Sequence, residues 1–141
     1  MSRYTDRAAE MRSLFKPDGK TVYNCAQTVA AVFASDAGYD ENTALRAATC
    51  FRGGMQMGSV CGAVTGGLLA LGLAGIEDRD TVDEYLRKVR QAHAGVVDCG
   101  TFVSDAQARG IEKKTCCDAL IRECVGYVEE ILKKNGVIGT D

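Results

Sequence analysis

Residues 53–76 read GGMQMGSVCGAVTGGLLALGLAGI and form the longest stretch of the chain without a charged side chain. Eight of these residues are glycine, and three polar residues interrupt the stretch. Its strongly apolar part, residues 68–76, is too short to span a bilayer, which requires about 20 residues. We therefore predict a glycine-rich loop at 53–58, followed by a buried helix at 59–73, and no membrane span.

Small residues recur at every fourth position of this predicted helix, namely Gly58, Gly62, Gly66, Ala70 and Ala74. Glycine inside a helix costs about 1 kcal/mol relative to alanine, so such a row indicates close approach of another helix backbone. The helix predicted just after Asn24 carries a matching row, Ala26, Ala30 and Ala34. We expect these two rows to pack against each other.

Apolar residues recur with helical periodicity along nearly the whole chain, and no segment alternates as a β-strand does. The other predicted helices span residues 7–15, 25–37, 42–50, 80–108 and 115–134. Asn24 and Thr115 are the expected N-caps of the second and the last of them. The whole chain, residues 1–141, is predicted to be one all-α domain, a bundle of about six helices around the central Gly/Ala-rich helix.

The composition of the chain excludes several classes of function. With 46% hydrophobic and 26% charged residues and a formal net charge of −2, it is typical of a globular protein and lacks the basic excess of nucleic-acid binders. The first residues are polar and do not resemble a secretory signal, so a cytoplasmic location is expected. Phosphate-binding and Rossmann glycine motifs are absent, and a single histidine leaves no Ser–His–Asp triad.

Seven cysteines are the most informative residues: Cys25, Cys50, Cys61, Cys99, Cys116, Cys117 and Cys124. In a reducing compartment they indicate thiol chemistry or metal binding before structural disulfides. No Cys-x-x-Cys pair occurs, so common zinc-ribbon and thioredoxin spacings are absent. The sequence assigns no role to Cys50 or Cys99.

Cysteines occupy three predicted helix starts, at Cys25, at Cys61 and at the pair Cys116–Cys117. The partial positive charge of a helix N-terminus lowers the pKa of a thiol, and Arg52, upstream of Cys61, is expected to act in the same direction.

The only histidine, His93, lies on the apolar stripe of the predicted helix at 80–108. Two interpretations stay open for it: a core histidine with one hydrogen bond, or the proton partner of a nearby thiol.

Helix geometry limits which cysteines can pair. Cys117 and Cys124 are two turns apart, about 10.5 Å along one helix, which exceeds the Cα separation of a disulfide. A bond between the adjacent Cys116 and Cys117 would strain the backbone. Any pairing therefore runs between helices, for example from Cys117 or Cys124 to Cys61 or Cys25, and the same helix face could instead present two ligands to a metal.

The pattern of NCAQ at 24–27, CGAVTG at 61–66, CDAL at 117–120 and CVGYV at 124–128 resembles the C-GCAxxG-C-C family of small redox-active proteins. The likeness covers nearly the whole chain, although here cysteine precedes glycine in the central motif. It implies that Cys25, Cys61, Cys117 and Cys124 are the functional cysteines, with Cys116 as an alternative to Cys117. It implies redox or metal chemistry and names no substrate.

Three hypotheses of function follow. The first is a thiol–disulfide oxidoreductase or redox carrier, with Cys61 as the attacking thiolate, Cys117 or Cys25 as its resolving partner, and Cys124 completing a second pair. The second is a zinc or iron–sulfur protein in which Cys25, Cys61, Cys117 and Cys124 are the ligands. The third is a non-catalytic helical module that docks onto a redox partner protein or forms a homo-oligomer through its Gly/Ala row.

Overall fold

The computed structural model describes residues 2–139 and contains only helices, turns and loops in that range. The α-helices are α1 (Arg3–Arg12), α2 (Cys25–Ala31), α3 (Glu41–Ala47), α4 (Gly62–Leu73), α5 (Arg79–Ala92), α6 (Cys99–Ala108) and α7 (Lys113–Lys134). Shorter helical turns lie at η1 (Ser35–Ala37), η2 (Thr49–Phe51) and η3 (Gly54–Gly58). Within residues 2–139 the only β-type pairings are two isolated bridges, so the all-α prediction is confirmed.

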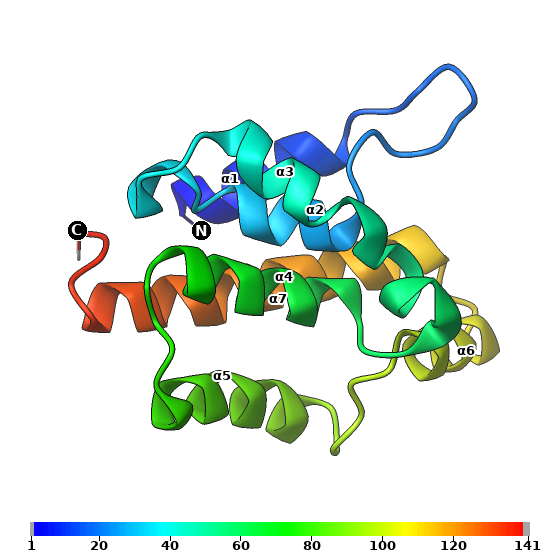
Figure 1. Cartoon of the computed structure of the whole chain (residues 1–141). Coiled ribbons are helices and arrows are strands. Elements are labelled where there is room, and N and C mark those ends of the chain that lie inside the picture. The colour runs from blue at the N-terminus through cyan, green and yellow to red at the C-terminus, as the bar shows by residue number, and fades with distance from the viewer. Residues whose placement is uncertain (1, 140–141) are drawn as a thin grey trace.

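The helices are arranged in layers around α7, the longest helix (Figure 1). Helix α4 packs against α7, helices α1, α2 and α3 lie above this pair, α5 lies below it, and α6 is at one end. The core between these layers includes the fully buried side chains Val64, Leu71, Tyr85, Val125 and Leu132. The loop between α1 and α2 projects at the same end of the molecule as α6.

The expected contact between the small-residue rows is confirmed at the crossing of α2 and α4. A Cβ atom built on Gly66 would lie 2.6 Å from the Ala26 carbonyl oxygen, and one on Gly62 would lie 3.2 Å from Cβ of Cys25. The glycines therefore allow the two backbones to touch. Gly58 is outside this row, because it lies in η3 and faces Gly100 instead.

The single helix predicted at 80–108 is wrong, because the chain breaks between α5 and α6. Ala94 and Gly95 adopt left-handed conformations, with φ of 53° and 87°, and the Gly95 N–H donates to the Arg90 carbonyl at 2.8 Å. The apolar residues happen to continue in helical phase across the break, which is why periodicity alone did not reveal it. His93 is consequently the C-cap of α5 and does not lie within a helix.

Helix α7 begins earlier than predicted, so Thr115 is not its N-cap. The first helical residue is Lys113, and Glu112 occupies the cap position without a side-chain hydrogen bond. Cys116 and Cys117 therefore lie about one turn inside the helix. By contrast, the Asn24 cap is confirmed, since its side chain accepts a hydrogen bond from the Gln27 N–H at 2.8 Å.

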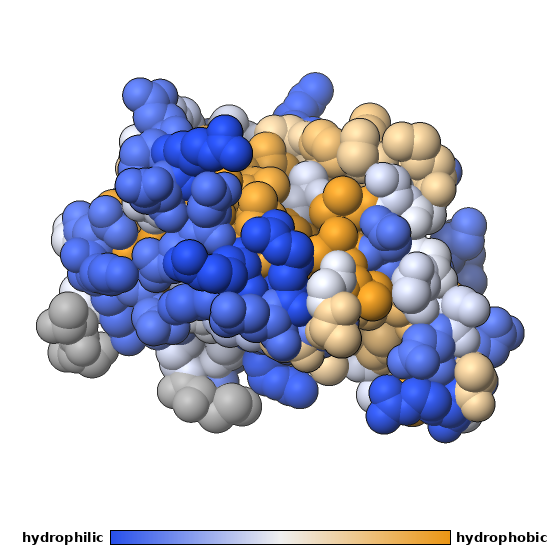
Figure 2. Space-filling model, turned by 90° about the horizontal axis from the view of Figure 1, so that it is seen from below, coloured by the Kyte–Doolittle hydropathy of each residue, from blue (hydrophilic) through white to orange (hydrophobic). Residues whose placement is uncertain are grey.

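Helix α5 is strongly amphipathic and covers the lower face of the bundle. Its Tyr85 and Val89 are buried against the core, while Lys88 pairs with Glu130 of α7 at 3.0 Å. Figure 2 shows hydrophilic residues over one side of this lower face and hydrophobic residues gathered at its centre. Within residues 2–139, no helix combines the length and apolar character needed to cross a membrane.

Candidate functional site

Five of the seven cysteines line one cleft of about 530 Å³, which we call the thiol cleft: Cys25, Cys61, Cys99, Cys116 and Cys117. These residues come from the N-terminal parts of α2, α6 and α7 and from the residue that precedes α4. All seven cysteines are free thiols in this structure. The cleft therefore collects thiols from three helices and from the residue before a fourth, at one end of the bundle.

Two backbone hydrogen bonds bring Cys61 and Cys99 to the same wall of the cleft. The Cys61 N–H donates to the Val97 carbonyl at 2.8 Å, and the Cys99 N–H donates to the Ser59 carbonyl at 2.7 Å. These bonds join the loop before α4 to the segment between α5 and α6. The break in the predicted 80–108 helix is thus what places Cys99 at the site.

Cys25 and Cys117 are an interacting pair of thiols in the cleft. The Cys25 thiol interacts with Cys117 across the α2–α7 interface and favours the thiolate of Cys117. This interaction, together with the charges of Arg12 and Lys113, lowers the pKa of Cys117 to about 7. The same interaction and burial raise the pKa of Cys25 well above its ordinary value.

The Arg12 side chain forms hydrogen bonds to residues near both Cys25 and Cys117. Its Nε donates to Oδ1 of Asp118 at 2.7 Å, and its Nη1 donates to the Tyr23 carbonyl at 2.8 Å. Asp118 directly follows Cys117, and Tyr23 is two residues before Cys25. The buried guanidinium therefore positions both cysteines and supplies a positive charge beside them.

The expected low pKa of Cys61 is wrong. Cys61 precedes the first residue of α4, and the N–H groups of Ala63 and Val64 lower its pKa, as expected for a helix start. Burial outweighs them, because only 4% of the residue is exposed, and raises the pKa to about 11. Arg52 lines the cleft but does not reverse this effect.

The adjacent Cys116 and Cys117 have different surroundings. Cys116 approaches the Phe102 carbonyl with its Sγ at 3.9 Å, and burial raises its pKa. Cys99 has a raised pKa for the same reason. Of the five cysteines that line the cleft, only Cys117 has a pKa below its ordinary value.

Cys124 and Cys50 lie away from the cleft. Cys124 is fully buried in the core beside the Tyr85 hydroxyl, and burial raises its pKa strongly. Cys50 is exposed in η2. Because Cys124 does not line the cleft, the second pair expected for it is not assembled there.

His93 has a carboxylate partner, and no thiol within residues 2–139 is hydrogen-bonded to it. Its Nε2 lies 2.7 Å from Oε2 of Glu123 on α7, and its ring meets Phe102 edge-on at 5.1 Å between centroids. Of the two interpretations of His93, the hydrogen-bonded structural role is the one that this geometry matches.

The four cysteines expected as metal ligands are not gathered around one point. Within the described range 2–139, no group of three or more His, Cys, Asp or Glu side chains is placed to hold a metal ion. Three of the four, Cys25, Cys61 and Cys117, line the cleft, while Cys124 lies in the core behind it.

Sequence reasoning missed the part of the charged border that precedes α2. Lys16 and Lys20 flank the turn that ends at Gly19, and Arg12 lies at the end of α1, all far in sequence from the cysteines of α6 and α7. The one available signal was the cluster of basic residues between 12 and 20. Nothing in the local sequence indicates that this loop reaches α7.

The fold and site together define an all-helical, cysteine-rich protein with reduced thiols collected in an open cleft. The family model described as "Putative redox-active protein (C_GCAxxG_C_C)" matches residues 23–131. The chain therefore belongs to this redox-active family, and all seven cysteines lie within the matched range. Searches of curated proteins and of solved structures gave no match.

Proposed function

We propose that this protein carries out thiol–disulfide exchange, with Cys117 as the attacking thiolate and Cys25 as the resolving thiol. The observation that carries the proposal is that Cys25 of α2 and Cys117 of α7 line the same open cleft, with the buried Arg12 hydrogen-bonded to residues near both. With a pKa of about 7, about half of Cys117 is thiolate at neutral pH. The same reasoning leaves Cys61 almost entirely protonated, so Cys117 replaces it as the proposed nucleophile.

The proposed reaction is a two-electron oxidation of the protein by a disulfide, R–S–S–R. The Cys117 thiolate attacks one sulfur, which forms a mixed disulfide and releases the first R–S⁻. The Cys25 thiol then loses its proton and attacks Sγ of Cys117, which forms the Cys25–Cys117 disulfide and releases the second R–S⁻. The two released thiolates take up two protons from solvent, which replace the one lost by Cys25 and the one lost earlier when Cys117 ionised. A dithiol reductant, such as a partner redox protein, would reverse the reaction.

A reducing compartment fits this proposal, because the exchange must start from free thiols. We propose the cytoplasm as that compartment. Cys117 is half-buried at the cleft, and its pKa is lowered. A module that only docks onto a partner would need neither property, so these two features favour exchange over a purely docking role.

Site-resolved alkylation of the reduced protein tests the proposal. Iodoacetamide should label Cys117 with an apparent pKa of about 7, while Cys61 and Cys124 stay unlabelled in the folded state. In a separate sample that has not been alkylated, addition of a small disulfide should produce a Cys25–Cys117 bond that peptide mass spectrometry detects.

Three variants separate the roles of these cysteines. Cys117→Ser should abolish exchange, and Cys25→Ser should stop the reaction at a mixed disulfide on Cys117. Cys50→Ser, which changes an exposed cysteine outside the cleft, should exchange as the unmodified protein does. Full exchange activity in Cys117→Ser would refute the assignment.

A further inference from the structure

The border of the thiol cleft is basic, although the chain as a whole is slightly acidic. Basic residues line the cleft at Arg12, Lys16, Lys20, Arg52, Lys113 and Lys114. Among the described residues, no aspartate or glutamate lines it. In a chain with 17 basic and 19 acidic residues, this one-sided border is a local departure from the overall balance.

Most of these cations are not neutralised by a carboxylate. Asp118 binds Arg12 at 2.7 Å and Lys114 at 2.6 Å. The others, Lys16, Lys20, Arg52 and Lys113, form no ion pair with any residue between 2 and 139. Unpaired cations around a concave surface create a positive potential that attracts anions and concentrates them there.

The dimensions of the cleft fit a small molecule. A volume of about 530 Å³ lies within the range of small-molecule sites, and Phe15 and Phe102 supply apolar walls. The Cys117 thiolate itself carries a negative charge, so a second anion can approach it only where nearby cations offset the repulsion. Lys113 and Arg12 already stabilise that thiolate, which leaves Lys16, Lys20 and Arg52 as the unpaired cations available to an incoming group.

We propose that the oxidant of Cys117 is an anionic, low-molecular-weight disulfide whose carboxylates bind the basic border. This inference rests on the exchange reaction proposed above and names its class of substrate. Lys20 and Arg52, with Lys16 beside them on the border, bind the carboxylates, and the disulfide sulfur faces Cys117. The redox stoichiometry is the one given for the exchange reaction. One substrate disulfide is reduced to two thiols, and Cys25 and Cys117 are oxidised to one disulfide.

The test compares three aliphatic disulfides of similar size and different charge: 3,3′-dithiodipropionate, bis(2-hydroxyethyl) disulfide and cystamine. Each rate with the reduced protein is divided by the rate of the same disulfide with 2-mercaptoethanol, which corrects for the different leaving thiols. At low salt the normalised rate should be at least about tenfold higher for the dianion than for the dication. Raising the salt to about 0.5 M should remove most of this ratio, because the Debye length then shortens to a few ångströms.

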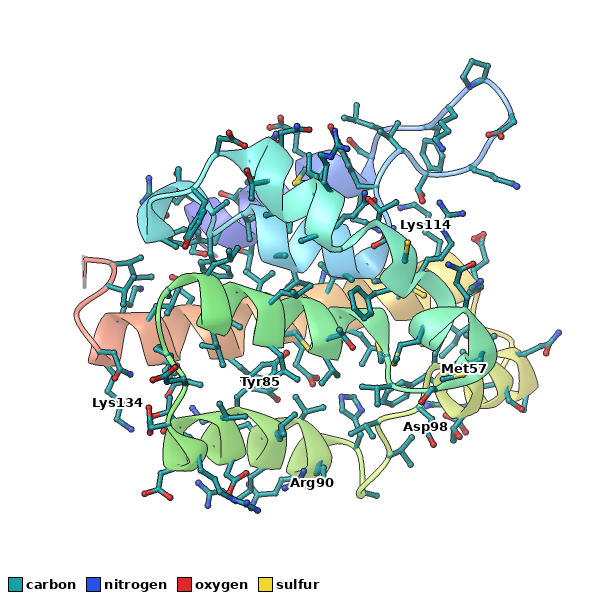
Figure 3. All side chains as sticks on the ribbon, in the orientation of Figure 1. Met57, Tyr85, Arg90, Asp98, Lys114 and Lys134 are labelled. Carbon is teal, nitrogen blue, oxygen red and sulfur yellow. The ribbon has the colours of Figure 1, made fainter. Side chains whose placement is uncertain are left out.

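Charge variants locate the effect. Lys20→Gln and Arg52→Gln should each lower the ratio of dianion to dication rates, and the double variant should lower it further. Arg90→Gln is the matched control, because Arg90 is an exposed arginine on α5 and lies away from the cleft. Figure 3 shows Arg90 on the lower side of α5, far from Lys114 of the cleft border.

A binding measurement separates this inference from the exchange reaction. Adipate, a dicarboxylate without sulfur, should slow the alkylation of Cys117 by iodoacetamide, and 1,6-hexanediol should not. Equal normalised rates for the three disulfides, or a ratio unchanged in the double variant, would overturn the anionic substrate while exchange itself stands. The opposite outcome is also possible: none of the three disulfides oxidises Cys117, while adipate still slows its alkylation. That outcome would overturn the exchange reaction and show only an anion-binding site.

Discussion

Substitution of Gly66 by alanine tests the close contact between α2 and α4 that positions Cys25. An added Cβ would lie 2.6 Å from the Ala26 carbonyl oxygen and 3.0 Å from Cβ of Val29. Both contacts are shorter than van der Waals contact, and the nearer one is with backbone, so the two helices must move apart. Overpacking of this kind costs about 1–3 kcal/mol.

The matched control is Gly72→Ala in the same helix. Gly72 is exposed, and a Cβ there would meet nothing within 4 Å. Both substitutions gain the same helix propensity, about 1 kcal/mol, so the difference between the two variants isolates the steric cost. We expect Gly72→Ala to be slightly more stable than the unmodified protein and Gly66→Ala to be less stable than Gly72→Ala by about 1–3 kcal/mol.

Equilibrium urea unfolding, followed by circular dichroism, measures this difference. In the Gly66→Ala variant, alkylation of Cys117 should also show a higher apparent pKa, because movement of α2 weakens the interaction of Cys25 with Cys117. Equal stability of the two alanine variants would refute the reasoning, since it would mean that the helices do not touch at Gly66.

Two further predictions concern charge and pH. Arg12→Met should raise the pKa of Cys117 from about 7 toward its ordinary 9.0, measured by the pH dependence of alkylation, whereas Arg90→Met should leave it unchanged. Burial holds the Cys61 and Cys124 thiols protonated in the folded protein, with raised pKa values, so their contribution to stability is fully present below pH 9.0 and is lost as pH rises toward about 11. The urea concentration at the unfolding midpoint, measured between about pH 7 and 10.5, should therefore decrease as the pH rises above 9. The decrease should be less steep in Cys61→Ala. A midpoint that does not change with pH would contradict the assigned effect of burial.

The helices and their contact at the small-residue rows follow from local patterns. Asn24 marks the start of α2 because its side chain can accept from a backbone N–H three residues later. The spacing of Gly62 and Gly66 indicates a second helix at close range, since only that gain offsets the cost of glycine in a helix. Both inferences concern residues within one or two turns of each other.

The break before α6 shows the limit of periodicity as a guide. The apolar stripe continues in phase through His93, yet Gly95 is a local helix-ending signal, because its left-handed φ of 87° lets its N–H bond back to the Arg90 carbonyl. The direction that the chain takes after this break depends on the hydrogen bonds of Cys61 and Cys99, whose partners are distant in sequence.

Sequence alone determined that the protein is helical, that its cysteines cluster near helix starts and that it resembles a redox-active family. Tertiary structure decided which thiol ionises, because burial and distant charges control the pKa. Cys61 and Cys117 both follow predicted helix starts, yet burial raises the pKa of Cys61 to about 11, while Arg12, which lies 105 residues before Cys117 (117 − 12), helps to lower that of Cys117 to about 7. The N-terminus of a helix is specified by residues that are close in the sequence, whereas desolvation and Coulomb interactions depend on the neighbours that folding brings together.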